Sequence, residues 1–64
     1  MSNLKAIRTN RGITQKQLSE SSGVPLSMVQ KYEGKFKDIN HACAITVLKL
    51  ADALGVEVRD LMED

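Results

Sequence analysis

The sequence predicts one small all-α domain, and three observations support this prediction. The chain has 64 residues, of which 42% are hydrophobic and 27% charged, which is enough for one globular domain and too little for two. Apolar residues recur every three or four positions, and no alternating strand pattern competes with them. Turn-forming residues separate five segments of helical pattern, and these residues are Gly12, Gly23, Pro25, Gly34 and Gly55. We therefore expect a compact five-helix domain over residues 1–64.

The first two helices are expected over residues 3–11 and 15–22. Thr14 and Gln17 have the spacing of a capping box at the start of the second helix. In this motif the threonine hydroxyl accepts a hydrogen bond from an unpaired backbone amide, and the glutamine reaches back to the capping residue. Glycines, which tolerate the left-handed conformation, are expected to end both helices.

A third helix is expected over residues 25–33. It opens with Pro25, which suits a first helical turn because the N–H that proline lacks would be unpaired there anyway. Val29 and Tyr32 are three positions apart, so both are expected to face the core. Gly34 then ends the helix.

The fourth helix is expected from about residue 44 to Gly55, with Asn40 as an alternative cap for an earlier start. Its apolar face is expected to consist of residues at three-residue intervals, namely Ile45, Leu48, Ala51 and Leu54, with Val47 and Leu50 flanking them. In the long connection before it, Ile39 is expected to insert into the core. A fifth helix is expected over residues 57–63.

Catalytic and metal-binding chemistry has little support in the sequence. The single cysteine, Cys43, excludes an intramolecular disulfide, fits a reducing cytoplasm and is expected to be a small core residue. His41 is two positions away, so the two side chains would not face each other on a helix, and companion metal ligands are missing. We therefore expect no enzyme activity, no cofactor and no metal site. No apolar stretch approaches the length of a membrane span, and the first residues lack the charged region of a secretory signal.

The net charge of +1 hides an asymmetry between the two halves of the chain. Residues 1–37 carry seven lysines and arginines against two glutamates, which gives a net charge of +5. Residues 38–64 carry two basic residues against six acidic ones, which gives −4. A basic half joined to an acidic half indicates one face that binds a polyanion and another that does not.

Residues 15–34 have the spacing of a helix-turn-helix, in which two short helices are joined by about three residues that include a glycine. Leu18 is expected to face the core, and Ser19 is small where the second helix crosses the first. Gly23 supplies the left-handed turn conformation that a Cβ atom would penalise. Val24 is expected to pack inward from the turn.

Five stretches, taken together, carry a family resemblance that covers roughly residues 3–63. They are Gly12-Ile13-Thr14-Gln15-Lys16-Gln17-Leu18, Ser22-Gly23-Val24, Val29-Gln30-Lys31-Tyr32-Glu33-Gly34, Leu48-Lys49-Leu50-Ala51-Asp52-Ala53-Leu54-Gly55-Val56 and Asp60-Leu61. With these residues the chain resembles the lambda-repressor-like, Cro/XRE family of helix-turn-helix regulators. The resemblance implies a five-helix lambda-repressor-like fold. It also implies a cytoplasmic transcriptional regulator of bacterial or phage origin, more often a repressor, that binds specific sequences of double-stranded DNA.

The resemblance makes residues 25–33 the recognition helix, whose N-terminal part lies in the major groove. If Val29 and Tyr32 face inward, four other side chains face outward and are the candidates for reading bases: Leu26, Ser27, Gln30 and Lys31. Glutamine suits adenine and lysine suits guanine. Leu26 has two alternatives, since it either contacts a thymine methyl group or packs against the helix over 15–22.

Contacts to the DNA backbone are expected from Thr14, Gln15, Lys16, Lys35 and Lys37. Gln15 matches a family glutamine that binds a phosphate and braces the recognition helix. Arg11 is a further candidate, although at a helix end it also satisfies carbonyl groups. Arg8 and Glu33 match a family pair that forms a partly buried salt bridge between the first and third helices, so we interpret them as structural. Ser19 and Ser22 depart from the family pattern, which more often has alanine and an apolar residue there.

Family members usually bind as dimers on two half-sites about one helical turn, roughly 34 Å, apart. The candidates for homodimer contacts are Val56, Val58, Leu61 and Met62, which are more apolar than one short terminal helix needs. The alternative is that all four cover the core of the monomer. An alternative function also stays open, because the outward face of the third helix has no arginine and only one lysine. The alternative function is that of a protein–protein interaction module, or of an antitoxin-type regulator that binds DNA with help from a partner protein.

Overall fold

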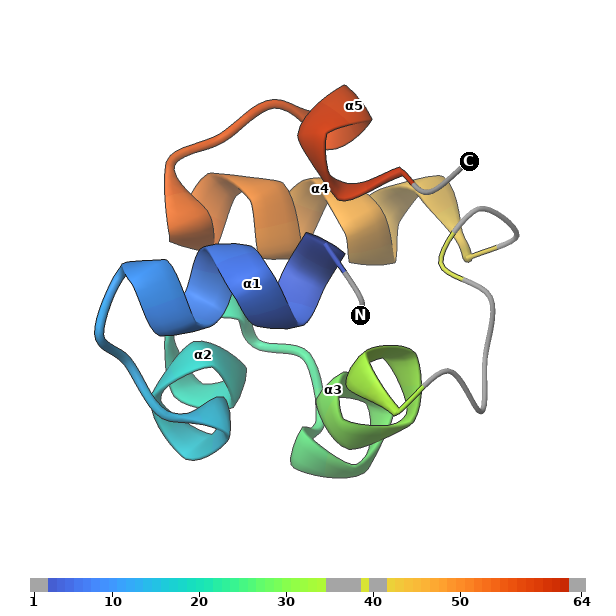
Figure 1. The fold of residues 1–64 in the computed structure, drawn as a ribbon. Helices are drawn as coiled ribbons and strands as arrows, with labels where there is room; N and C mark the ends of the chain where they lie inside the picture. Colours follow the sequence, from blue (N-terminus) through green and yellow to red (C-terminus); the bar gives the residue numbers. More distant parts are fainter. Residues whose placement is uncertain (1–2, 35–38, 40–41, 63–64) are drawn as a thin grey trace.

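Five helices follow one another in the part of the chain that the computed structural model describes, which comprises residues 3–34, 39 and 42–62 (Figure 1). They are α1 (Asn3–Asn10), α2 (Gln15–Ser22), α3 (Leu26–Glu33), α4 (Ala44–Leu54) and α5 (Val58–Leu61). None of the described residues belongs to a strand. The all-α, five-helix class predicted from the sequence is therefore confirmed.

The helices are arranged around α1, which crosses the middle of the molecule (Figure 1). In this view α2 and α3 lie below α1, and α4 and α5 lie above them. α2 packs against both α3 and α4, α4 packs against α5, and α1 contacts α3 and α5. The outer surfaces of α3 and α4 are thus separate parts of the molecular surface.

The core lies where the helices meet, and each helix contributes at least one buried apolar side chain. Val24 adds a buried side chain from the turn between α2 and α3, and Ile39 adds one from the connection between α3 and α4. The prediction that Ile39 inserts into the core is confirmed. The buried apolar residues are Leu4, Leu18, Val24, Val29, Tyr32, Ile39, Val47, Leu50, Ala51, Leu54 and Leu61.

The helix boundaries differ from the predicted ones at three places. α1 ends at Asn10, one residue earlier than expected. α3 begins at Leu26, because Pro25 has an extended backbone (φ −54°, ψ 142°) and is the N-cap instead of a residue of the first turn. α5 is shorter than the expected span of 57–63, since Met62 is again extended (φ −70°, ψ 147°).

The buried face of α4 corrects the sequence prediction. Ile45 and Leu48 were expected to face the core, but they are 63% and 51% exposed. The face that is buried consists of Val47, Leu50, Ala51 and Leu54. Each step of three residues falls about 60° short of a full turn, so a series of four such positions drifts around half of the helix. Only the last two members of the predicted series therefore reach the core.

Cys43 also differs from the prediction, because it is exposed and does not belong to the core. It is the N-cap residue of α4, with an extended backbone (φ −57°, ψ 135°). A residue in this position precedes the first helical turn, so its side chain is not aligned with the buried row of the helix.

The candidate dimer residues at α5 mainly serve the monomer. Leu61 is fully buried, which corrects the expectation that it is available to a second copy. Val56, Val58 and Met62 are half-buried and pack against the core. The Asn3 side-chain amide donates to the Met62 carbonyl oxygen over 2.7 Å and so ties α1 to the residue after α5.

Candidate nucleic-acid interface

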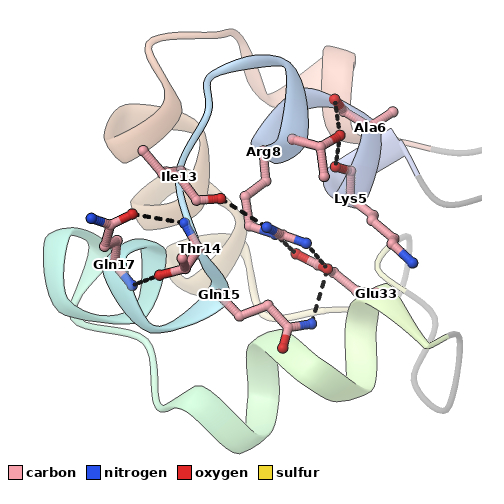
Figure 2. A network of polar contacts seen from close by, with 9 residues as sticks. Lys5, Ala6, Arg8, Ile13, Thr14, Gln15, Gln17 and Glu33 are labelled. Atoms are coloured by element: carbon pink, nitrogen blue, oxygen red, sulfur yellow. Dashed lines mark hydrogen bonds and ion pairs between the residues drawn. The ribbon is translucent and has the colours of Figure 1, made fainter.

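A capping box fixes the start of α2 (Figure 2). The Thr14 hydroxyl oxygen accepts a hydrogen bond from the Gln17 backbone N–H over 3.0 Å. The Gln17 side-chain oxygen accepts one from the Thr14 backbone N–H over 2.8 Å. Both bonds satisfy amides that the helix itself leaves unpaired, as the sequence predicts. Lys16 lies within this first turn and is exposed.

The turn between α2 and α3 is held by a glycine and two serines. Gly23 has φ +76°, a conformation that residues with a Cβ atom rarely adopt, and its N–H donates to the Ser19 carbonyl oxygen over 2.9 Å. The Ser19 hydroxyl donates to the Val24 carbonyl oxygen over 2.6 Å. The Ser22 hydroxyl oxygen accepts from the Val24 N–H over 3.1 Å. The two serines therefore satisfy both backbone groups of the buried Val24.

This role of the serines was not predicted from the sequence, which indicated only that Ser19 is small where the two helices cross and that Ser19 and Ser22 depart from the family pattern. Serine hydroxyls commonly bond to backbone groups a few residues away. Serines placed four residues and one residue before a turn glycine are a sequence signal for such bonds. The two bonds hold the backbone of the turn between α2 and α3.

α3 has one buried side and one exposed side. Val29 and Tyr32 face the core, as predicted. The exposed side carries Leu26, Ser27, Gln30 and Lys31. Leu26 is 37% exposed, so part of its side chain is covered and part is open to solvent. Met28 is half-buried and packs against the core.

Three side chains from different segments meet at the C-terminal end of α3 (Figure 2). Glu33 is buried, and its carboxylate accepts from Arg8 Nε over 2.6 Å and from Arg8 Nη2 over 3.0 Å. Arg8 Nη1 also donates to the Ile13 carbonyl oxygen over 2.8 Å. Gln15 Nε2 donates to Glu33 Oε1 over 3.0 Å. The network joins α1, the α1–α2 turn, the start of α2 and the end of α3.

This network also keeps the negative charge of Glu33 away from the exposed side of α3. Glu33 is the only carboxylate of α3, and its side chain is 2% exposed and paired with Arg8. The exposed side of α3 therefore carries no negative charge, while Lys31 adds a positive one. Lys16 adds another at the start of α2. A surface of this kind attracts a polyanion.

The Arg11 guanidinium lies at the C-terminal end of α4, and not at the end of α1, which it follows in the sequence. Its guanidinium nitrogen Nη2 is 3.6 Å from the point where a Cβ atom on Gly55 would be. Gly55 is the C-cap of α4 and has φ +69°. A positive charge near the C-terminus of a helix interacts favourably with the helix dipole. Lys35 and Lys37, expected to contact the DNA backbone, lie outside the described residues.

The described residues offer neither a cluster of metal ligands nor a membrane-spanning helix. Within residues 3–34, 39 and 42–62, no three histidine, cysteine or acidic residues come close enough together to hold a metal ion. No helix in the same ranges has the length and apolar character needed to cross a membrane.

Comparison with protein families identifies this arrangement of α1, α2 and α3. A family model described as helix-turn-helix matches residues 4–35, half of the chain. The chain belongs to the Cro/C1-type helix-turn-helix family. Members of this helix-turn-helix family are DNA-binding regulators, and the match covers the exposed side of α3 and the network that holds it. Comparison with curated proteins and with solved structures found no match.

Proposed function

We propose that this helix-turn-helix protein represses transcription by binding a specific sequence of double-stranded DNA as a homodimer. α3 lies in the major groove, with its N-terminal half against the base edges. The observation that carries the proposal is the charge and chemistry of the exposed side of α3. This side offers hydrogen-bonding groups and one lysine, while its only carboxylate is buried against Arg8. The protein acts by binding and carries out no catalysis.

The exposed side chains of α3 have distinct roles in this proposal. Gln30 makes a two-bond contact with adenine, and Lys31 donates to the acceptors of guanine. Ser27 bonds to a base edge as a donor or an acceptor. The exposed part of Leu26 contacts a thymine methyl group, while its covered part packs against the protein.

The start of α2 binds the phosphate backbone. The unpaired amides of its first turn and the exposed Lys16 favour an anion there. Gln15 orients α3 through the hydrogen bond from its Nε2 to Glu33. Its side-chain oxygen makes no hydrogen bond within this network (Figure 2). Thr14 adds a hydroxyl that is already held in place by the capping box. We assign Lys35 and Lys37 to further phosphates next to the C-terminal end of α3.

The size of the monomer limits where its dimer partner binds. Half-sites one helical turn apart place the two copies of α3 roughly 34 Å apart, so each lies about 17 Å from the two-fold axis. The molecule measures 24 × 22 × 21 Å, so its centre lies roughly half that width from any side. An α3 helix about 17 Å from the two-fold axis is therefore farther from the dimer surface than the centre of the molecule is. The dimer surface is therefore on a side of the molecule away from α3.

The test compares two lysines that the proposal places in different roles. Binding sites are selected from a randomised duplex pool with the wild type, with Lys31→Ala and with Lys16→Ala. Lys31→Ala should lose its preference at one base position of each half-site, which corresponds to roughly 1–3 kcal/mol. Lys16→Ala should keep the consensus and bind all sequences more weakly. If both variants gave the same consensus and the same loss of affinity, α3 would not be the reading helix. Binding only in the presence of a second protein would instead favour a partner-dependent regulator.

A further inference from the structure

Leu26 is the one apolar side chain on the exposed side of α3. The other apolar side chains of this helix, Met28, Val29 and Tyr32, are half-buried or buried. Leu26 is the first residue of α3 and is 37% exposed, so it belongs to the N-terminal half that the proposed function places against the base edges. A leucine side chain neither donates nor accepts hydrogen bonds, so its contact with DNA is favourable only where the DNA is apolar too.

The base edges of the major groove offer one apolar group, the C5-methyl group of thymine. Thymine and cytosine also differ in polar groups, because O4 of thymine is an acceptor and the N4 amino group of cytosine is a donor. Leucine does not sense this second difference. A methyl group added to C5 of cytosine lies at the same place on the same edge as the methyl group of thymine. Thymine and 5-methylcytosine therefore offer Leu26 equivalent apolar surfaces.

The polar side chains around Leu26 do not exclude either base. Ser27 follows Leu26, and Gln30 lies one helical turn further along the same side of α3. Both side chains contain a donor and an acceptor, so each can pair with a carbonyl or with an amino group. Glu33, the only carboxylate of α3, is buried and cannot select the amino group of cytosine. The distinction between pyrimidines at this position therefore depends on the methyl group.

We propose that Leu26 recognises a pyrimidine C5-methyl group at one position of each half-site, where 5-methylcytosine serves as well as thymine. The proposal rests on the reading of bases by α3 in the proposed function and adds a ligand to it, namely DNA methylated at C5 of cytosine. Its consequence is regulation by methylation. A site with unmethylated cytosine at this position binds weakly, and methylation of that cytosine strengthens binding.

The size of the effect follows from the burial of one methyl group. Covering a group of this size changes a dissociation constant by about fourfold. A dimer reads the position twice, so a change in both half-sites amounts to about fifteenfold. Changing both half-sites together therefore gives the larger and more easily measured effect.

The first step of the experiment finds the position that Leu26 reads. Binding sites are selected from a randomised duplex pool with the wild type and with Leu26→Ser, and circular dichroism checks that the variant is folded. The position sought is the one where the wild type prefers thymine and the variant does not. Four duplexes are then made with thymine, uracil, cytosine or 5-methylcytosine at this position of both half-sites, each paired with its complementary base. Uracil differs from thymine only by the missing methyl group.

The second step measures the dissociation constants of these duplexes by fluorescence anisotropy. The wild type should bind the thymine and 5-methylcytosine duplexes within about threefold of each other, and the uracil and cytosine duplexes about fifteenfold more weakly. Leu26→Ser should bind thymine like uracil and 5-methylcytosine like cytosine. Leu48→Ser is the matched control, because it removes an exposed leucine from α4 and should keep the wild-type ratios.

The wild-type ratios alone decide the proposal, whether or not a variant folds. Equal binding of the thymine and uracil duplexes, or of the 5-methylcytosine and cytosine duplexes, would overturn it. So would a preference for the methyl group that survives in Leu26→Ser, or a selection in which no position depends on Leu26. A wild type that selects no consensus would refute the proposed function itself, whereas a consensus without any methyl preference would refute only the role of Leu26.

Discussion

Replacing Arg8 with alanine should strongly destabilise the protein, because it breaks a buried ion pair. The substitution removes both hydrogen bonds from Arg8 to Glu33 and leaves the carboxylate buried. Gln15 would remain as its donor, and one neutral donor does not replace a paired positive charge. The Glu33 side chain is only 2% exposed, so water cannot take the place of the guanidinium without local opening.

The magnitude follows from the burial of the pair. Removing one partner of a buried ion pair costs about 3–5 kcal/mol in the free energy of unfolding. A domain of this length has a total stability of about 3–10 kcal/mol, at roughly 0.05–0.15 kcal/mol per residue. Arg8→Ala should therefore remove roughly a third or more of the total stability. The measurement is urea-induced unfolding followed by far-UV circular dichroism.

The chain offers a matched control in a second arginine–glutamate pair. Arg59 Nε is 2.7 Å from Glu57 Oε2, and Arg8 Nε is 2.6 Å from Glu33 Oε2. The side chains of Arg59 and Glu57, however, are 83% and 67% exposed. Arg59→Ala should cost less than about 1 kcal/mol, because exposed ion pairs contribute little. The double variant Arg8→Met/Glu33→Leu should recover most of the loss, since it leaves no buried charge. Equal losses for Arg8→Ala and Arg59→Ala would refute the reasoning.

Three further predictions concern the helix-turn-helix and are measured by the same unfolding assay. Thr14→Ala removes the cap of α2 and should cost about 0.5–2 kcal/mol, whereas Thr14→Ser should be nearly neutral; equal losses for both would speak against the capping box. Gly23→Ala should cost about 1–2 kcal/mol from the left-handed backbone alone, since an added Cβ would meet nothing within 4 Å, and Gly23→Asn should cost less. Ser19→Ala removes the bond to the Val24 carbonyl and should cost about 0.5–1.5 kcal/mol, and a stabilised variant would contradict this.

The sequence predicted those features that depend on local chemistry. The capping box of Thr14 and Gln17 and the turn at Gly23 follow from rules that involve only a few neighbouring residues. The buried side of α3 was predictable because Val29 and Tyr32 fit one helical face without competition. The exposed side of α3 was then predicted as the residues that do not belong to the buried face.

The errors arose where the sequence allowed more than one buried face. α4 is apolar on much of its circumference, so periodicity alone did not distinguish the face of Leu50 from that of Ile45. Which face is buried depends on where α2 and α5 pack, and this information is not local. The same holds for Leu61, whose burial depends on the core formed by distant helices. The serine bonds in the turn were missed because the partners of a hydroxyl depend on the backbone geometry around it.

The most direct test of the central claim is selection of bound duplexes from a randomised DNA pool by the wild-type chain, repeated at two salt concentrations. Reading of bases by α3 predicts a palindromic consensus with half-sites about one helical turn apart, and this consensus should persist at the higher salt. Affinity should fall with salt as phosphate contacts are screened, while the preferred sequence stays the same. Weak retention without any consensus, abolished by modest salt, would contradict the account, because the basic surface would then bind phosphates without reading bases.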